Sequence, residues 1–158
     1  MRLGAKGRYA VMAMADIARH AQGFGGEADA VCLAEIAERQ EISLAYLEQL
    51  FAHLRRAGLV KSVRGPGGGY RLARPAEAIS VSAVVRAVDE PLHATRCDSH
   101  SETGCMAMGE RCATHHLWAA LGDEIESFLD GVSLADVIGK RILRRRDAAV
   151  GGAVEAVA

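Results

Sequence analysis

The chain has 158 residues, enough for one compact domain with an extension but too few for two unrelated domains. Half of the residues are hydrophobic and only 4% are aromatic, which favours a mainly α protein over a β-sandwich. The net charge of -1 hides an asymmetry: residues 1–75 carry 11 Lys and Arg against 7 Asp and Glu, whereas residues 76–158 carry 8 against 13. A basic N-terminal half fits a polyanionic partner better than an acidic substrate.

The first predicted element is an amphipathic helix over residues 6–21. Its expected buried face consists of residues at helical spacing, namely Val11, Met14, Ala15 and Ala18. Residues 22–29, with three glycines, predict a loop, and residues 33–39 predict a short second helix. Cys32 stands alone just before that helix, and we expect it to pack in the core.

A third helix follows a three-residue turn, and Ser43 has the chemistry of its N-cap. Ile42 and Leu47 are spaced as a hydrophobic staple, and Gly58 ends the helix. The expected buried stripe is Leu44, Leu47, Leu50, Phe51 and Leu54. The opposite face carries the polar and aromatic groups Tyr46, Gln49, His53 and Arg56. Such a face can read DNA bases, although in an isolated helix it is more often a solvated surface.

The next elements favour the DNA-reading interpretation. Two strand-like runs, 59–63 and 70–73, are joined by Arg64 and a loop of proline and glycine. Helix, tight turn, helix and hairpin together predict a winged helix-turn-helix, whose wing can place Arg64 in a minor groove. A nucleotide-binding P-loop is disfavoured, because the glycine-rich segment lacks a Gly-Lys-Ser/Thr ending and joins a strand to a strand.

The second half predicts a helix over 80–88, a loop and a long helix from residue 115. The long helix carries a seam at 3-4-3 spacing: Trp118, Leu121, Ile125 and Phe128. We interpret the seam as a dimerisation surface, with packing against the same chain as the alternative. The predicted regions are a DNA-binding region (1–88), a cysteine-rich loop (89–114), a dimerisation helix with a C-terminal helix (115–140) and a disordered tail (141–158).

The loop and the start of the long helix contain Cys97, Cys105, Cys112 and His115, with the spacing Cys-x7-Cys-x6-Cys-x2-His. No stretch of about 18 apolar residues and no signal-peptide region are evident, so we expect a cytoplasmic protein with no membrane contact. In a reducing compartment, cysteines are ligands, redox groups or core residues more often than disulfides. Three thiolates and an imidazole suit an iron-sulfur cluster or zinc. The wide gaps between the cysteines count against zinc and suit a larger cluster, and unligated thiols are the third alternative.

Up to about residue 136, the chain resembles the IscR-type iron-sulfur cluster regulators. The resemblance is carried by KGRYAV (6–11), ERQ (38–40), YLEQLF (46–51), GLV (58–60), SVRGPGGGY (62–70), AVDE (87–90) and ATRC (94–97). It implies a homodimeric winged-helix transcriptional regulator with one [2Fe-2S] cluster per chain. The implied cluster ligands are Cys97, Cys105, Cys112 and His115. His100 and His116 are rival ligands, but His115 fits the family pattern because Leu117-Trp118 follow it.

On the DNA side, the resemblance implies base-reading roles for Tyr46 and Gln49 and a phosphate contact for Ser43. It assigns a minor-groove contact to Arg64. It also implies that Glu48 discriminates between two operator classes: the apo protein binds one class, and the cluster permits binding to the other. An acid can accept a hydrogen bond from a cytosine amino group but repels base edges rich in acceptors.

Two features depart from the family pattern. The cysteine loop is three residues longer than the usual Cys-x5-Cys-x5-Cys-x2-His spacing, which bears on cluster geometry and stability. Ala45 replaces a serine found in many relatives, so one polar contact with DNA is expected to be missing.

The sequence thus predicts a regulator that represses iron-sulfur cluster assembly genes when its cluster is present and acts on other promoters without it. Double-stranded DNA, a second copy of the chain and cluster donor proteins are its expected partners. The alternative is a repressor of the same superfamily whose loop senses nitric oxide, iron supply or thiol oxidation. An electron carrier or redox enzyme is disfavoured, since no substrate pocket, nucleotide fingerprint or nucleophile-base pair is apparent.

Overall fold

The computed structural model describes residues 4–20, 30–90, 92 and 95–142. Its first half contains α1 (Ala5–His20), α2 (Leu33–Gln40), α3 (Leu44–Arg56), β1 (Val60–Val63) and β2 (Gly69–Leu72). Its second half contains the 3-10 helix η1 (Ala76–Ala78), α4 (Val81–Ala87), α5 (His115–Asp130) and α6 (Leu134–Ile138). The predicted loop over 22–29 and the predicted tail beyond residue 142 lie outside the described residues.

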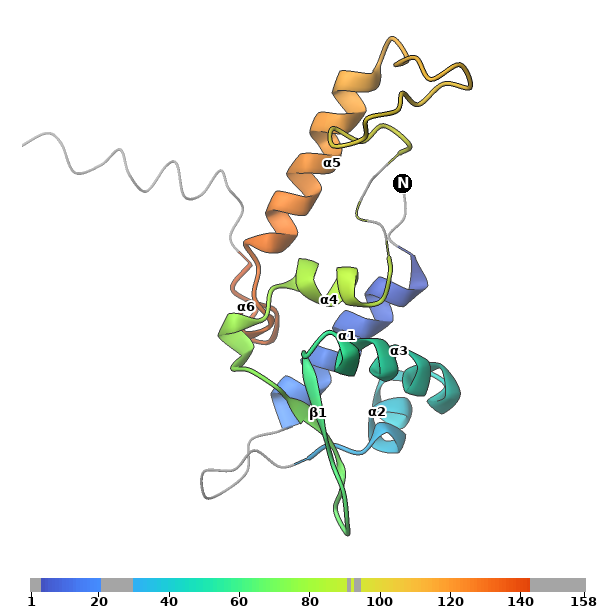
Figure 1. Cartoon of the computed structure of the whole chain (residues 1–158). Coiled ribbons are helices and arrows are strands. Elements are labelled where there is room, and N and C mark those ends of the chain that lie inside the picture. Colours follow the sequence, from blue (N-terminus) through green and yellow to red (C-terminus); the bar gives the residue numbers. More distant parts are fainter. Residues whose placement is uncertain (1–3, 21–29, 91, 93–94, 143–158) are drawn as a thin grey trace, which may run out of the picture.

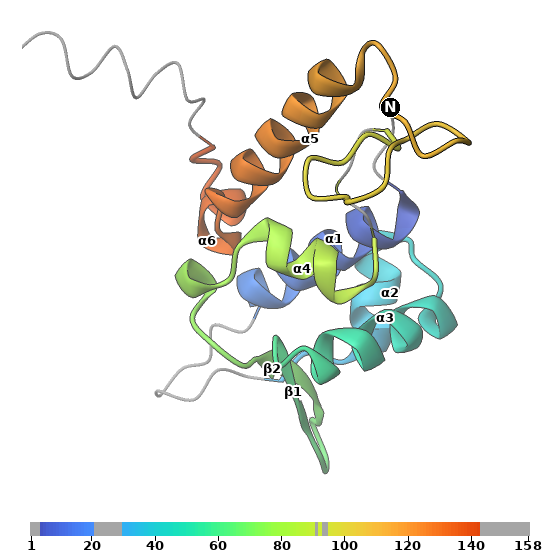
Figure 2. The ribbon, with the colours of Figure 1, turned by 45° about the horizontal axis from the view of Figure 1, so that its top comes forward.

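The arrangement confirms a mainly α, winged helix-turn-helix fold. Helices α1, α2 and α3 gather at one end, and the antiparallel wing projects from them (Figure 1). Helix α4 packs against both α1 and α5, and α5 extends away from the helix-turn-helix. In both views residues 95–114, which precede α5, lie beside that helix (Figures 1 and 2). This segment carries the predicted cysteine loop.

Helix α1 is at the centre of the core, packed against α2, α3, α4, α6 and β2. Its fully buried apolar residues are Ala10, Ala13, Met14 and Ile17. The predicted face is confirmed for Met14, and half-buried Val11 also packs against the core. Ala15 and Ala18 are only half-buried. The helix is largely apolar, so its sequence pattern cannot show which side is buried most completely. In the structure, α1 has neighbouring elements on several sides, and these determine which residues are fully buried.

Local signals correctly predicted the limits of α3. The Ser43 side chain accepts a hydrogen bond from the Tyr46 backbone N–H at 3.3 Å, as an N-cap does. Gly58 follows the helix with a positive φ of 68°. The predicted stripe is buried except for Leu44, which is 43% exposed. The prediction for Leu44 was wrong because this residue opens the helix, beside the exposed Ser43 and Ala45, outside the core.

Cys32 is exposed, so the prediction that it packs in the core was wrong. It lies in an extended segment in which side chains alternate between two sides. Its neighbours Val31 and Leu33 occupy the core side, and Val31 exchanges backbone hydrogen bonds with Tyr70 of β2. Cys32 therefore points outward.

A buried polar contact joins α1 to α2. The Asp16 carboxylate accepts hydrogen bonds from Arg39 Nη2 and from Gln40 Nε2, each at 2.7 Å. Burial alone would raise the pKa of Asp16, but the hydrogen bonds from Arg39 and Gln40 outweigh burial and lower the pKa below 3.8. Asp16 therefore remains charged and fixes the helix that precedes the turn.

We expect Asp16→Asn to lower the free energy of unfolding by about 2 kcal/mol at neutral pH, because it removes the charged partner of Arg39. Since folding lowers the pKa of Asp16, the stabilisation is complete above its ordinary value of 3.8 and is lost as the pH falls through the folded-state value. Urea unfolding at about pH 7 and about pH 3 measures both effects. Glu35→Gln is the control, because Glu35 contacts the same arginine from an exposed position. A variant as stable as wild type at neutral pH would contradict the prediction.

Candidate metal centre and nucleic-acid interface

Three cysteine sulfurs meet in the segment between α4 and α5. The Sγ atoms of Cys97, Cys105 and Cys112 all lie within 4.8 Å of one another. Those of Cys97 and Cys112 are 3.8 Å apart, and the backbone N–H of Cys112 donates to the sulfur of Cys105 at 3.3 Å. The structure thus brings together residues separated by seven and six others in the sequence. Thiolates at this spacing can bind a soft or borderline metal.

The thiol pKa values of Cys97 and Cys112 are shifted in opposite directions. Burial raises the pKa of Cys97, which is 6% exposed, and the neighbouring thiols raise it further. The pKa of Cys112 is lowered by hydrogen bonds from Cys105 and from the Thr114 hydroxyl. Because the thiolate is the form that binds metals, the lowered pKa of Cys112 favours its role as a ligand.

His115 is the first residue of α5 and is only 2% exposed. Within the described part of the chain, its Nδ1 is the buried side-chain nitrogen or oxygen that has no hydrogen-bond partner. His115 is not part of the close sulfur group, although it follows Cys112 by three residues. His116 and His100 are both exposed. A buried nitrogen without a partner costs free energy, which coordination to a metal would recover.

Local turns accommodate the long gap between Cys97 and Cys105. Asp98 Oδ1 accepts a hydrogen bond from the His100 backbone N–H at 2.8 Å. The Ser101 hydroxyl donates to the Thr103 carbonyl at 2.9 Å. The additional residues are therefore folded on themselves, and the sulfurs remain close despite the longer loop.

The gap between Cys105 and Cys112 forms a tight reversal of the chain. The Gly104 N–H donates to the Gly109 carbonyl at 3.1 Å, and the Met106 N–H donates to the Glu110 carbonyl at 3.0 Å. A Cβ atom at Gly104 would overlap the Glu110 carbonyl. Only glycine allows this close approach, which places Cys105 opposite Cys112.

We expect Gly104→Ala to lower the iron content of the protein about tenfold, because the added methyl group must displace the segment that positions Cys105. Iron per chain after anaerobic purification measures the effect. Ala107→Ser, an equally small change at an exposed position in the same turn, is the control and should retain wild-type iron. Equal iron in both variants would contradict the prediction.

The five residues predicted to contact DNA lie on α3, at its N-cap and on the wing. Ser43, Glu48, Gln49 and Arg64 are exposed. Tyr46 is half-buried, and its ring packs edge-on against Tyr9 of α1, with 5.9 Å between ring centroids. Exposed basic side chains also occur at the end of α3 (Arg55 and Arg56), on β1 (Lys61) and shortly after β2 (Arg74). The basic excess of the N-terminal half thus includes residues beside α3 and the wing.

Two contacts of this region were missed by the sequence analysis. The first is Tyr9, which supports Tyr46 and has the Arg8 guanidinium 5.6 Å from its own ring centre. The second joins α3 to the start of the cysteine segment, where His53 Nδ1 lies 3.3 Å from Asp89 Oδ2. Both contacts link elements distant in sequence, so no local signal could have revealed them.

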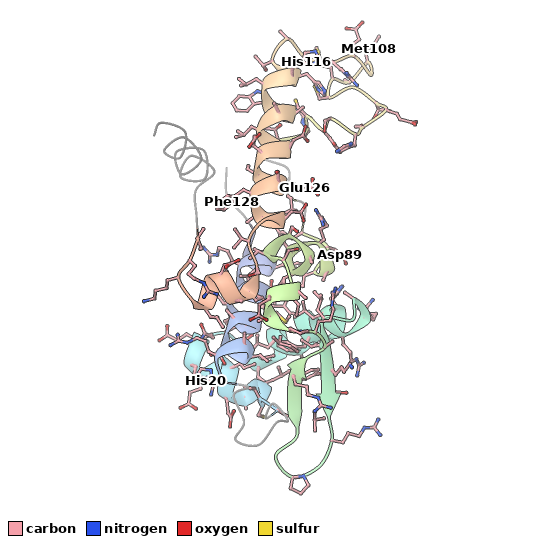
Figure 3. All side chains as sticks on the ribbon, turned by 90° about the vertical axis from the view of Figure 1, so that its left-hand side faces the viewer. His20, Asp89, Met108, His116, Glu126 and Phe128 are labelled. Atoms are coloured by element: carbon pink, nitrogen blue, oxygen red, sulfur yellow. The ribbon has the colours of Figure 1, made fainter. Side chains whose placement is uncertain are left out.

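Figure 3 shows Met108 and His116 at the end of the molecule farthest from the wing, and Phe128 farther along α5. The seam residues Trp118, Leu121 and Ile125 are half-buried in the single chain, and Phe128 is 44% exposed. The chain itself therefore leaves much of the predicted seam uncovered. None of the helices in the described residues has the length and apolar character needed to cross a membrane.

The tight turn between α2 and α3, the capped α3 with its exposed polar face and the wing define a winged-helix DNA-binding regulator. Residues 3–140 match the Rrf2 family, which is described as iron-dependent transcriptional regulators. The chain belongs to this family, as the resemblance in its sequence predicted.

Named relatives agree with this assignment. The chain is 56% identical to the HTH-type transcriptional regulator IscR of Aliivibrio salmonicida over 138 residues, covering 87% of this chain and 77% of the relative. It is 54% identical to the regulator of the same name from Yersinia enterocolitica over 141 residues, covering 89% and 81%. These relatives are named as transcriptional regulators and not as enzymes, which confirms the prediction that the chain is a regulator and not a redox enzyme.

Solved structures show the same fold. IscR of T. potens superposes with a TM-score of 0.69 at 38% identity, covering 89% of this chain and 88% of that chain. CymR of B. subtilis, described as the global cysteine regulator, superposes with a TM-score of 0.70 at 31% identity, covering 89% and 98%. The protein is therefore a DNA-binding transcriptional regulator similar to IscR.

Proposed function

We propose that this regulator senses the supply of iron-sulfur clusters through a [2Fe-2S] cluster held by Cys97, Cys105, Cys112 and His115. The observation that carries the proposal is the close approach of the three cysteine sulfurs. The same segment of chain leads into α5 at His115, whose buried Nδ1 has no hydrogen-bond partner. Three cysteines and one histidine are a donor set that [2Fe-2S] clusters accept. When bound, the cluster supplies a redox-active group whose presence reports supply.

The residues of the chain would tune such a centre. A neutral imidazole in place of a fourth thiolate makes the centre less negative, and protonation of that ligand favours loss of the group. The N–H of Cys112 donates to the Cys105 sulfur, and hydrogen bonds to ligand sulfurs alter the potential. Both features suit a sensor whose cluster is assembled and lost more than they suit a permanent electron-transfer centre.

On the DNA side, we propose that Tyr46 and Gln49 read base edges, that Ser43 contacts a phosphate and that Arg64 enters the minor groove. Glu48, exposed on α3 next to Gln49, would discriminate between two operator classes. Operators of helix-turn-helix proteins are read by dimers, and the uncovered seam on α5 supports a homodimer. The regulator would act in the cytoplasm and receive its cluster from donor proteins.

The function is tested by following an assembly-gene promoter in cells limited for cluster assembly, with no added oxidant. We expect repression in replete cells and its loss on limitation, and we expect cells carrying Cys112→Ala to be derepressed in both conditions. An unchanged response to limitation would contradict the proposal. It would leave a regulator with another signal.

The second candidate is a sensor of thiol oxidation, and the 3.8 Å between the Cys97 and Cys112 sulfurs favours it over sensing of nitric oxide or iron supply. A disulfide requires the two sulfurs to approach to about 2.05 Å, a short movement in a loop. Adding hydrogen peroxide to iron-free protein distinguishes a sensor of thiol oxidation from a sensor of cluster supply. Only the thiol sensor would then change its affinity for DNA.

A further inference from the structure

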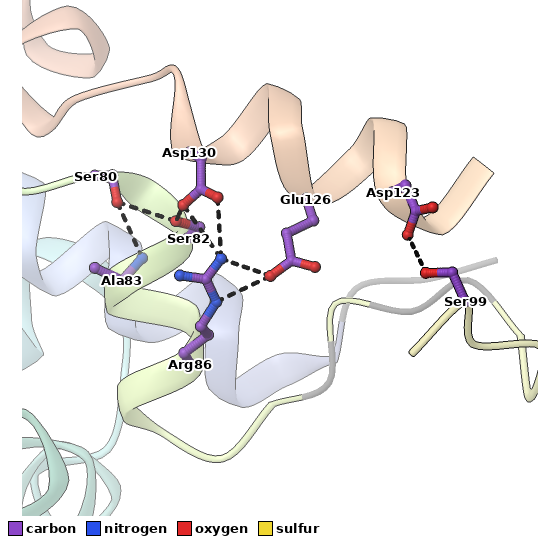
Figure 4. Close-up of polar contacts among 8 residues, drawn as sticks. All are labelled: Ser80, Ser82, Ala83, Arg86, Ser99, Asp123, Glu126 and Asp130. Carbon is purple, nitrogen blue, oxygen red and sulfur yellow. Dashed lines mark hydrogen bonds and ion pairs between the residues drawn. The ribbon is translucent and has the colours of Figure 1, made fainter. Parts of the chain in front are cut away.

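Helix α5 carries a row of acidic side chains that contacts two other parts of the molecule (Figure 4). Asp123 Oδ1 accepts a hydrogen bond from the Ser99 hydroxyl of the cysteine loop at 2.7 Å. One turn later, Glu126 accepts from Arg86 of α4 at 2.5 Å, and Asp130 accepts from the same arginine at 3.1 Å and from Ser82. The row therefore holds the loop at one point and α4 at two others.

We propose that Asp123 is a positioning residue of the metal centre, which acts through Ser99 to hold the Cys97 arm of the loop against α5. The inference rests on the proposed function, because it concerns how this chain keeps its metal ligands together. It also explains how the longer gap between Cys97 and Cys105 can be accommodated: part of the additional length is fastened to a helix.

The short chain between Cys97 and Ser99 limits how far Cys97 can move when Ser99 is held. Ser99 is two residues from Cys97, and two residues span at most about 7 Å, so fixing Ser99 confines Cys97 to a small volume. Asp123 lies on the same helix as His115, about 12 Å along the axis at 1.5 Å per residue. One rigid helix therefore positions both the first and the last proposed ligand.

Without this contact, the Cys97 arm gains conformational freedom that metal binding must remove again. The ligands themselves and the bonds within the loop would be unchanged. We therefore expect the contact to govern how long a cluster is retained and how well Cys97 is protected, and not which residues bind it.

The test compares Ser99→Ala, Asp123→Ala and the double variant as full-length protein carrying the cluster. Anaerobic loss of visible absorbance in the presence of a chelator gives the rate of cluster loss. We expect each single variant to lose its cluster about three to ten times faster than wild type, and the double variant to be no faster than either. Asp123→Asn, which keeps an oxygen that accepts from Ser99, should restore most of the wild-type rate.

Glu126→Gln is the matched control, because it removes a carboxylate of the same helix that contacts α4 and not the loop. It should lose its cluster at the wild-type rate. Rates in Ser99→Ala and Asp123→Ala equal to the wild-type rate, or additive effects in the double variant, would overturn the inference.

A second measurement keeps the inference separate from the proposed function. Cys97 is 6% exposed, and its alkylation by iodoacetamide in protein stripped of metal can be followed by mass spectrometry. We expect alkylation of Cys97 to be several times faster in Asp123→Ala than in wild type or Glu126→Gln. If the wild-type protein binds no cluster, the proposed function fails and this rate alone decides: an unchanged rate overturns the contact between Ser99 and Asp123 as a positioning device.

Discussion

Replacing Cys112 with alanine is expected to lower the iron and acid-labile sulfide content more than about tenfold while leaving the fold intact. Cys112 is the most connected of the three cysteines: its sulfur is 3.8 Å from that of Cys97, and its N–H donates to Cys105. Its thiol also has the lowered pKa. The measurement is iron and sulfide per chain after anaerobic purification, with circular dichroism to verify the helices.

Cys32→Ala is the matched control, since Cys32 is exposed before α2 and is not part of the close sulfur group. It should retain wild-type iron. His115→Ala and His116→Ala form a second pair: loss of iron only in the first would support the buried histidine as the fourth ligand. Retention of iron and sulfide by Cys112→Ala would contradict the proposed ligand set.

The second large effect concerns DNA. We expect Gln49→Ala to lose about 1–3 kcal/mol of discrimination at one base pair, because an amide side chain on the exposed face of α3 can form paired hydrogen bonds with a base edge. Arg64→Ala should weaken binding to all sequences alike, and the loss of one cationic group from the interface should reduce the salt dependence of binding. Binding to a panel of operators with single base-pair changes, at several salt concentrations, measures both.

Arg141→Ala provides the control for lost charge, because Arg141 is an exposed arginine beyond α6, outside α3 and the wing. Its DNA affinity and salt dependence should match those of wild type. If Gln49→Ala weakened binding to every operator equally, α3 would only position the protein on the phosphate backbone. The base-reading role of Gln49 would then be wrong.

The sequence predictions were accurate where a feature depends on neighbouring residues and inaccurate where it depends on distant parts of the fold. Ser43 as an N-cap, Gly58 after the helix and the strands of the wing depend on neighbouring residues, and the structure confirms them. Cys32 and Leu44 were predicted to be buried and are exposed. Cys32 lies on the outer side of an extended segment, and Leu44 opens α3 beyond the edge of the core, so in both cases the rest of the fold decides burial.

The site, like the fold, was predicted where local sequence signals exist and not where distant residues meet. The spacing of cysteines and histidine indicated a metal centre, and the structure brings the three sulfurs together. The contact between Ser99 and Asp123 joins residues 24 positions apart, and that between His53 and Asp89 joins residues on separate elements. Residue types alone cannot reveal such pairs, because serine, histidine and aspartate are common on any solvated surface.

The most direct test of cluster binding is the metal and sulfide content of the full-length protein purified anaerobically from cells with ample iron. We expect about two iron and two acid-labile sulfide ions per chain, with a visible spectrum of a [2Fe-2S] cluster. A colourless protein that binds zinc, contains no sulfide and gains no cluster on reconstitution would contradict this prediction. The molecule would then remain an Rrf2-family DNA-binding regulator whose signal is not an iron-sulfur cluster.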